Sequence, residues 1–305
     1  MEKNEPGLRR LLSPIPQNAD VVLDTDAYNE IDDQFALAYL FGSKEAYTVK
    51  AVTAAPFSNA RADSPALGME KSYDEVQNIL NLMGKSDFAD RVFRGSKEYL
   101  KGESVSVSSP ASDEIIRLAL AQPESRPLYI LAIGAITNIA SALLSCPDIA
   151  RKIYVVWLGG HAHHWPRNDE FNLRQDIAAA RVVFGSGAPV VQLPCMGVVS
   201  HLMASGYELK HYLEGKNPLC DYLYRITWEE GSHNGKKDCW SRILWDVSAV
   251  AWLKGGLVRD YVDHIAMPTY DMGYSFAKTR PFYRYAYWLD RDAIMQDLYN
   301  TLASF

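Results

Sequence analysis

The sequence has no long apolar run. No stretch reaches the ~18 consecutive apolar residues that a membrane-spanning helix requires. Its first residues, MEKNEPGLRRLLSPIPQ, are charged and interrupted by proline, so they lack the apolar core of a signal peptide. These two absences predict a soluble, cytoplasmic protein that does not enter a membrane.

Cysteine is scarce and shows no pattern. The chain of 305 residues has four cysteines, Cys146, Cys195, Cys220 and Cys239. They form no CxxC pair and no spacing typical of a disulfide framework or a zinc site. We therefore expect buried free thiols in a reducing compartment.

An excess of positive charge is also missing. The formal net charge is −6, so there is no electrostatic reason for the protein to bind nucleic acid or an anionic membrane. The sequence contains no internal repeat, no low-complexity segment and no linker. With 48% hydrophobic and 22% charged residues, the composition is ordinary for a globular protein. We predict a single domain over residues 1–305.

The sequence does contain an alternation of strand-like and helix-like segments. Short β-branched runs predict strands at 19–26, 47–56, 127–134, 151–160 and 188–194. Apolar residues at helical spacing predict helices at 33–43, 69–84, 112–122, 136–145 and 176–187. This order indicates an α/β fold with a mostly parallel, Rossmann-like open sheet and helices on both faces. The α/β core of the domain is expected to span residues 19–197.

The rest of the chain, residues 198–305, has a different pattern. It predicts helices at 206–215, 220–230 and 241–255, a β-rich stretch at 264–289 and a closing helix at 290–305. We expect this helical and β-rich part to complete the same domain.

Acidic side chains crowd the junction between the first predicted strand and the first predicted helix. The segment DTDAYNEIDDQFALAYL, residues 24–40, has four aspartates and one glutamate within ten residues. Ligands of an open parallel sheet bind beyond the carboxyl ends of its strands, so we expect Asp24 and Asp26 to project into that crevice. Asp32 and Asp33 open the helix, where capping and the helix dipole explain one or two carboxylates. Four converging carboxylates repel one another, which predicts a hard cation such as calcium or magnesium between them.

Two other metal-dependent protein classes have a similar cluster. An EF-hand loop does not fit, because Asn29 occupies the position of its glycine and Phe35 that of its closing glutamate. An aspartyl phosphatase also starts with Asp-x-Asp after a strand, but it has Thr or Val where this chain has Tyr28. A metal-dependent phosphohydrolase is therefore a weaker alternative.

The acidic segment resembles the motif Asp-x-Asp-Pro-Gly-x-Asp-Asp of the calcium-dependent, inosine-uridine preferring nucleoside hydrolases. Ala27 replaces the proline, and two extra residues precede the Asp pair. Three later segments follow in the family's order. LYILAIGAITNIASALL resembles its block GPLTNIA, VVWLGGHAHHWPRNDEFNLRQDIAAARVVF resembles MGG…AEFN…DPEAA, and LWDVSAVAWL resembles HDPLAVAYLL. The resemblance runs from Asp20 to Leu253 and is that of a divergent branch.

This resemblance implies a nucleoside hydrolase fold and hydrolysis of the N-glycosidic bond of a ribonucleoside or related ribosyl conjugate. It implies a Ca²⁺ ion held by the carboxylates of Asp26, Asp33 and Asp246 and by the backbone carbonyl of Ile133. Asp26 is also the implied general base, which takes a proton from the calcium-bound water. The residues implied in sugar binding are Asp32, Asn59, His164, Glu170 and Asn172. Asp24 is expected to brace the loop.

One departure from the family concerns the leaving group. Where the family has a histidine implicated in protonating the leaving base, this chain has Trp245. An indole N–H is not appreciably acidic near neutral pH, so Trp245 is expected to contact the substrate without protonating it. Candidate replacements are His163, His164 and His233 as donors, or Trp240 and Tyr224 as stacking partners. The two-residue insertion within Tyr28–Ile31 also changes the loop beneath the sugar.

Trp245 leaves a second interpretation open, a non-catalytic protein that binds calcium and a sugar on the same scaffold. In either case the expected partners are Ca²⁺ and a small-molecule nucleoside or ribosyl compound. Members of the family often form dimers or tetramers, so the resemblance also implies a homo-oligomer.

Overall fold

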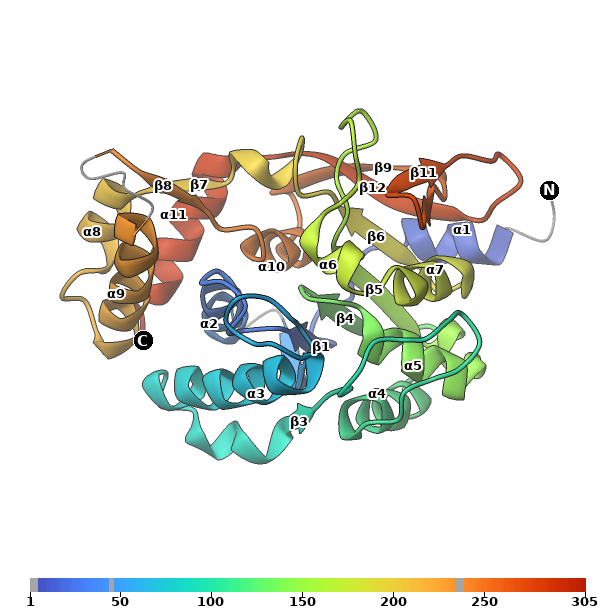
Figure 1. Ribbon diagram of the computed structural model, residues 1–305, viewed down its shortest axis with the longest axis horizontal. Coiled ribbons are helices and arrows are strands. Elements are labelled where there is room, and N and C mark those ends of the chain that lie inside the picture. Colours follow the sequence, from blue (N-terminus) through green and yellow to red (C-terminus); the bar gives the residue numbers. More distant parts are fainter. Residues whose placement is uncertain (1–4, 44–46, 234–238) are drawn as a thin grey trace.

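One large sheet forms the centre of the protein. The computed structural model describes residues 5–43, 47–233 and 239–305. Eight strands pair in the order β3-β2-β1-β4-β5-β6-β12-β9 (Figure 1). All neighbours in this order are parallel except β12 and β9, which are antiparallel. The strands are β1 (Ala19–Thr25), β2 (Tyr47–Ala54), β3 (Val92–Arg94), β4 (Leu128–Ala132), β5 (Ile153–Leu158), β6 (Val190–Leu193), β9 (Val258–His264) and β12 (Phe282–Leu289). The mostly parallel sheet expected from the sequence is confirmed.

Both faces of the sheet are buried, as expected for parallel strands that are covered by crossover helices. In β1, Val21 and Leu23 belong to one hydrophobic cluster and Val22 to the other. In β5, Val156 and Trp157 are divided between the same two clusters. Side chains alternate along a strand, so each strand packs against two layers of helices.

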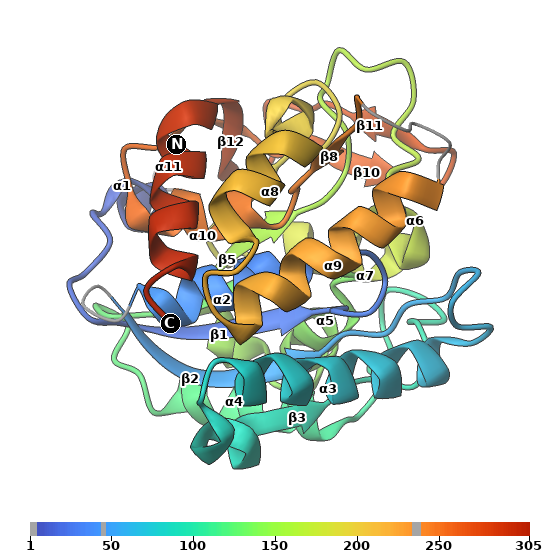
Figure 2. The same ribbon diagram turned by 90° about the vertical axis from the view of Figure 1, so that its left-hand side faces the viewer.

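The helices divide between the two faces. Helices α4 (Pro110–Leu120), α5 (Thr137–Ser145) and α7 (Ile177–Gly185) contribute to one cluster. The other cluster contains side chains of α1 (Glu5–Leu12), α2 (Asp33–Gly42), α3 (Pro65–Leu82) and α10 (Val247–Lys254). An outer group lies beside α2 and α3 (Figure 2) and consists of α8 (Gly206–Leu213), α9 (Pro218–His233) and α11 (Arg291–Leu302).

The last third of the chain adds strands to the same sheet. β12 pairs in parallel with β6, and β9 pairs with the outer edge of β12. Two short antiparallel ribbons join this part. They are β7 (Met203–Ser205) with β8 (Ser241–Ile243), and β10 (Met267–Thr269) with β11 (Gly273–Ser275).

The structure differs from the sequence-based elements in several places, which include the unpredicted strands β3, β7 and β9. Residues 241–255 were expected to form one helix, but Ser241–Ile243 is a strand and the helix begins at Val247. Pairing with β7 overrides the local helical pattern there. Helix α1 was not predicted from its charged, proline-broken sequence, and it packs against β12.

All four cysteines are free, as expected from their spacing. The expected burial is found for Cys195 and Cys220 but is wrong for Cys239, which is exposed, and for Cys146, which is only partly buried. In the described part of the chain, no helix is both long enough and apolar enough to cross a bilayer.

Candidate active site

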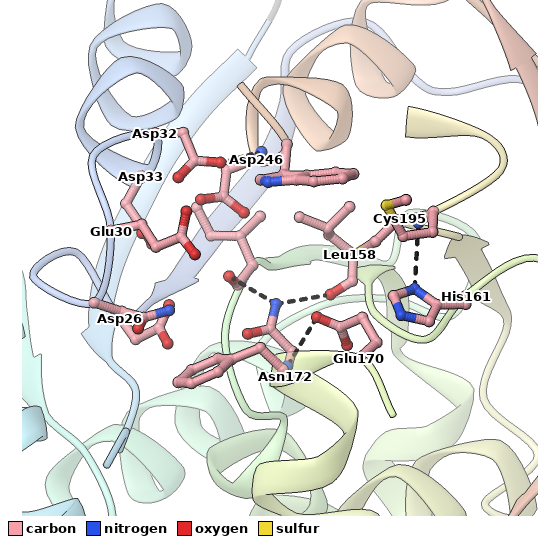
Figure 3. A pocket seen from close by; sticks show the side chains of 15 residues that line it. Asp26, Glu30, Asp32, Asp33, Leu158, His161, Glu170, Asn172, Cys195 and Asp246 are labelled. Atoms are coloured by element: carbon pink, nitrogen blue, oxygen red, sulfur yellow. Dashed lines mark hydrogen bonds between the residues drawn. The ribbon is translucent and has the colours of Figure 1, made fainter. Parts of the chain in front are cut away.

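A cavity of about 250 Å³ lies at the carboxyl edge of the sheet. Its wall is built by the segments that follow β1, β4, β5 and β6, by the start of a short helix, α6 (Phe171–Gln175), and by the residues before α10 (Figure 3). Parallel strands place all their carboxyl ends at one edge, so segments distant in sequence meet there.

One side of the cavity is strongly acidic. Asp32, Asp33 and Asp246 are buried, and each places a carboxylate oxygen within 4.8 Å of the others. Asp32 and Asp33 lie at the start of α2, and Asp246 directly precedes α10. Because α10 packs against α2, carboxylates from opposite ends of the sequence come together.

Helix capping does not account for these carboxylates. Asp32 and Asp246 occupy the N-cap positions of α2 and α10, but neither side chain makes a capping hydrogen bond. Instead, the backbone N–H of Asp246 donates to Oδ2 of Asp32 at 3.3 Å. The hydroxyl of Thr25 donates to Oδ1 of Asp33 at 2.5 Å. These two bonds connect β1, α2 and α10 and hold the acidic groups against one another.

Asp26 faces the same cavity from just beyond the end of β1. Its side chain is buried, and its Oδ2 has no hydrogen-bond partner among the residues that the structure describes. Asp26 does not belong to the group of three carboxylates within 4.8 Å, although we expected it to share an ion with Asp33 and Asp246. The third member of that group is Asp32, which we expected to bind the sugar.

The acidic groups are difficult to ionise together. Burial raises the pKa of Asp33 to about 6. Burial also raises the pKa values of Asp26, Asp32 and Asp246 well above their usual range, and repulsion from the neighbouring carboxylates adds to the effect. A hard cation with oxygen ligands relieves both the desolvation and the repulsion. The acidic side therefore fits a calcium or magnesium ion.

The backbone carbonyl of Ile133 adds a neutral oxygen to this wall. Ile133 follows the last residue of β4, and its carbonyl accepts a hydrogen bond from Nδ2 of Asn172 at 3.2 Å. A carbonyl oxygen has two lone pairs, so one is left for another partner.

Glu170 and Asn172 are buried in the cavity wall and do not form a surface turn. Glu170 caps α6, and its carboxylate accepts three backbone N–H bonds at 2.9 Å. Nδ2 of Asn172 donates to the carbonyls of Ile133 and Leu158, at 3.2 and 3.1 Å. Both donors of the Asn172 amide are thereby used, and its oxygen is the atom left to accept a bond from a ligand.

Asp24 does not line the cavity, contrary to our expectation. Its Oδ1 accepts bonds from the hydroxyl of Thr53 at 2.5 Å and from Nδ2 of Asn138 at 2.8 Å. It lies within β1 on the same face as Val22, toward α5, whereas Asp26 lies beyond the strand end. Burial raises the pKa of Asp24 to about 7. The residue braces β1 against β2 and α5.

Two residues expected to bind the sugar are also outside the cavity wall. Nδ2 of Asn59 donates to Oδ1 of Asn29 at 2.7 Å, so Asn59 supports a lining residue without lining the cavity itself. His164 is exposed, and His161 occupies the wall at this part of the chain. Trp245 does line the cavity, as expected.

The other candidates for leaving-group activation lie elsewhere. His163 is held in an aromatic cluster, where its ring stacks on Tyr285 at 4.1 Å and Nε2 is 3.0 Å from the hydroxyl of Tyr283. Burial lowers the pKa of His163 to about 4. Trp240 and Tyr224 both pack near Trp228 and are not in the cavity wall. The side chain of His233 is outside the described residues.

Five lining residues were not predicted from the sequence, namely Leu158, His161, Phe171, Cys195 and Met196. Leu158 is the last residue of β5, Phe171 begins α6, and the other three follow β5 or β6. A general signal was available, because every residue just beyond a parallel strand is a candidate for this edge. The inserted loop adds Asn29 and Glu30, while Tyr28 is exposed beside Arg61 and Lys71.

A substitution at Gly134 tests whether the position of Asp26 matters. A Cβ atom at residue 134 would lie 3.0 Å from both Cγ and Oδ1 of Asp26 and 3.1 Å from Cβ of Ala55. Gly134→Ala should therefore displace the Asp26 carboxylate by a few tenths of an ångström and lower kcat about tenfold, since misplaced catalytic groups lose rate steeply. Gly102→Ala, whose Cβ meets nothing within 4 Å, is the matched control. Equal kcat values for the two variants would contradict the prediction.

Comparison with known proteins identifies the family of this chain. Residues 21–281 match the family model of the inosine-uridine preferring nucleoside hydrolases. The pyrimidine-specific ribonucleoside hydrolase RihA of Salmonella paratyphi A is 27% identical over 258 residues, which cover 76% of this chain and 78% of that protein. A plant nucleoside hydrolase, PpNRh1, superposes with a TM-score of 0.77 at 20% identity, over 95% of this chain and 100% of that one. A purine-preferring ribonucleoside hydrolase from Gardnerella vaginalis superposes with a TM-score of 0.70 at 19% identity, over 93% and 98% of the two chains. The chain belongs to the inosine-uridine preferring nucleoside hydrolase family and is an N-glycosyl hydrolase.

Proposed function

We propose that the protein hydrolyses the N-glycosidic bond of a ribonucleoside or a related ribosyl conjugate, with a calcium ion as cofactor. The observation that carries the proposal is the convergence of Asp33 and Asp246, from distant segments, in the cavity that Asp26 also lines. A related protein described as a pyrimidine-specific ribonucleoside hydrolase supports the substrate class.

The carboxylates of Asp26, Asp33 and Asp246 and the carbonyl of Ile133 are the proposed calcium ligands. Bound there, the ion supplies positive charge that orients the ribose diol and the attacking water and makes that water more acidic. The unpartnered Oδ2 of Asp26 and the raised pKa values of the cluster support this assignment. Asp32 lies close enough to Asp33 and Asp246 to compete for the ion, so its role must be separated experimentally.

Asp26 is the proposed general base. Its second oxygen makes no bond to a described residue and is therefore free to take a proton from the attacking water. Asp32 and the amide oxygen of Asn172 then accept hydrogen bonds from the sugar hydroxyls. Glu170 faces the same cavity but is already bonded to three backbone N–H groups, so its main role is to hold α6 and Asn172 in place.

The departing base receives no proton from the residue before Asp246. Trp245 lines the cavity and offers an aromatic surface, and its indole N–H is a donor without useful acidity. Substrates whose leaving group departs without protonation should therefore react fastest.

A set of three ribosides tests the proposed function. Purified protein with calcium is given inosine, uridine and p-nitrophenyl riboside, while free ribose and p-nitrophenol are measured. We expect ribose to be released from each substrate that is cleaved. The kcat for the p-nitrophenyl riboside, whose leaving group needs no acid catalyst, should be at least about tenfold higher than the kcat for inosine or uridine.

Two outcomes would contradict the proposal. Calcium-dependent ligand binding without ribose release would show that the scaffold binds the sugar and does not turn it over. Release of inorganic phosphate from a nucleotide, with no ribose, would favour the phosphohydrolase alternative that the Asp-x-Asp motif left open.

A further inference from the structure

His161 is held in the cavity wall by three separate contacts. Its backbone N–H donates to Oδ1 of Asn168 at 2.6 Å, and its Nδ1 accepts the backbone N–H of Met196 at 3.3 Å. Its ring meets Trp165 edge-on at 6.2 Å. The preceding Gly160 has φ +74°, and a Cβ there would collide with the hydroxyl of Tyr274. The backbone turn that presents His161 to the cavity therefore requires glycine.

The hydrogen bond at Nδ1 decides which nitrogen carries the proton. Because Nδ1 accepts a bond, the neutral imidazole has its hydrogen on Nε2. Burial lowers the pKa of His161, which favours this neutral form at neutral pH. Among the described residues Nε2 has no hydrogen-bond partner, so a fixed, uncharged donor remains for a ligand.

The position of this donor indicates which part of a ribosyl group it meets. In Figure 3, Asp26 and His161 lie on opposite sides of the cavity, with Glu170 beside His161. Under the proposed function the diol faces the acidic side, and C1′ faces Asp26, whose water attacks it. In a furanose ring C4′ lies across the ring oxygen from C1′, so the C5′ group points away from Asp26. It therefore points toward His161.

We propose that Nε2 of His161 donates a hydrogen bond to the 5′-hydroxyl of the ribosyl substrate and is the residue through which this site distinguishes a 5′-hydroxyl from a 5′-deoxy group. This inference rests on the proposed function, which sets the orientation of the sugar. A neutral donor suits a hydroxyl oxygen. A 5′-phosphate would meet no cation from His161 and would lie in a cavity lined by the carboxylates of Glu170 and the acidic side.

The experiment varies the C5′ group and the leaving group together. Four substrates are used: the p-nitrophenyl ribosides with a 5-hydroxyl and with 5-deoxy, and uridine with 5′-deoxyuridine. The variants are His161→Ala, His161→Gln, which keeps an N–H donor near the place of Nε2, and the control His211→Ala, which changes an exposed histidine of α8 outside the cavity wall. Circular dichroism and Tm confirm that each variant is folded.

The wild-type protein should prefer each 5-hydroxyl substrate about tenfold or more in kcat/KM, since a site built to bind a hydroxyl is left with an unpaired donor by the deoxy analogue. In His161→Ala, kcat/KM should fall about 10- to 100-fold with the hydroxyl substrates and less than about threefold with the deoxy substrates. His161→Gln should recover part of the preference, and His211→Ala should match the wild type. Uridine 5′-monophosphate should remain uncleaved.

Three results would overturn the inference. The first is an equal loss of kcat/KM by His161→Ala on hydroxyl and deoxy substrates. The second is a wild type that does not prefer the hydroxyl substrates. The third is a loss of kcat/KM that depends on the leaving group and not on C5′. The third result would place His161 beside the departing nucleobase. If no substrate is cleaved, the proposed function fails, and His161 is then tested by the rise in Tm that each riboside causes in the calcium-loaded protein. A preference for the hydroxyl riboside that His161→Ala removes supports the inference, and its absence overturns it.

Discussion

Asp26→Asn is expected to lower kcat about 10²- to 10⁴-fold, the usual contribution of a positioned general base. Asparagine has nearly the same shape as aspartate but cannot take a proton from water. The change should weaken calcium binding as well, because it removes one of the proposed charged ligands. Steady-state kinetics with p-nitrophenyl riboside and calorimetric titration with calcium measure the two effects separately.

Two other aspartates provide the comparison for Asp26. Asp20→Asn changes a carboxylate at the opposite end of β1, where Gln122 donates to it at 2.8 Å, and it should leave kcat unchanged. Asp32→Asn should mainly raise KM, because Asp32 is proposed to bind a sugar hydroxyl. A loss of calcium affinity in Asp32→Asn as large as that in Asp26→Asn would instead make Asp32 a ligand. Near-normal turnover by Asp26→Asn would show that another group is the base.

Removal of calcium is expected to abolish turnover and to make stability strongly dependent on pH. In the folded protein the pKa of Asp33 rises to about 6, and those of Asp26, Asp32 and Asp246 lie well above their usual range. An unfolded aspartate has a pKa of about 3.9. Between that value and the raised pKa values the folded state binds more protons than the unfolded state, so its stability falls as pH rises.

Thermal unfolding between pH 5 and 8, with a chelator or with calcium, measures this effect. With the chelator, Tm should fall as pH rises through 6 and above. Calcium replaces the protons, so the rise in Tm that calcium causes should grow with pH. It should reach about 4 °C at a hundredfold excess of calcium over Kd. His163, with a pKa lowered to about 4, acts in the opposite direction, because its contribution to the stability of the folded state is lost as pH falls below 6.5.

Asp246→Asn separates the acidic cluster from the other titrating groups. It removes one of the buried charges, so its Tm in chelator should fall less with pH than that of the wild type, and calcium should stabilise it less. If wild type and variant show the same pH dependence and the same response to calcium, the cluster does not hold the ion.

Much of the fold and part of the site follow from the sequence alone. β-Branched runs and apolar residues at helical spacing predict a mostly parallel sheet, because burial on both faces leaves a periodic signal within each segment. The acidic motif ending in Asp32 and Asp33 and the later block around Asp246 indicate the family, which the match over residues 21–281 confirms. These features are local in sequence or repeat a known order of motifs.

Only the tertiary structure decides where individual side chains point. Asp24 faces Thr53 and Asn138 because it lies within β1, on the face toward α5. Asn59 binds Asn29 in the inserted loop. At residue 241, strand β8, which pairs with β7, replaces the start of the expected helix.

The same holds for the histidines. Motif spacing places His164 at a sugar contact, but the turn at Gly160 and the backbone N–H of Met196 put His161 into the wall. The sequence by itself determined the sheet, the family and the acidic groups, because these depend on periodicity and on motif order. The rest of the cavity depends on contacts between segments far apart in the chain, which no local pattern records.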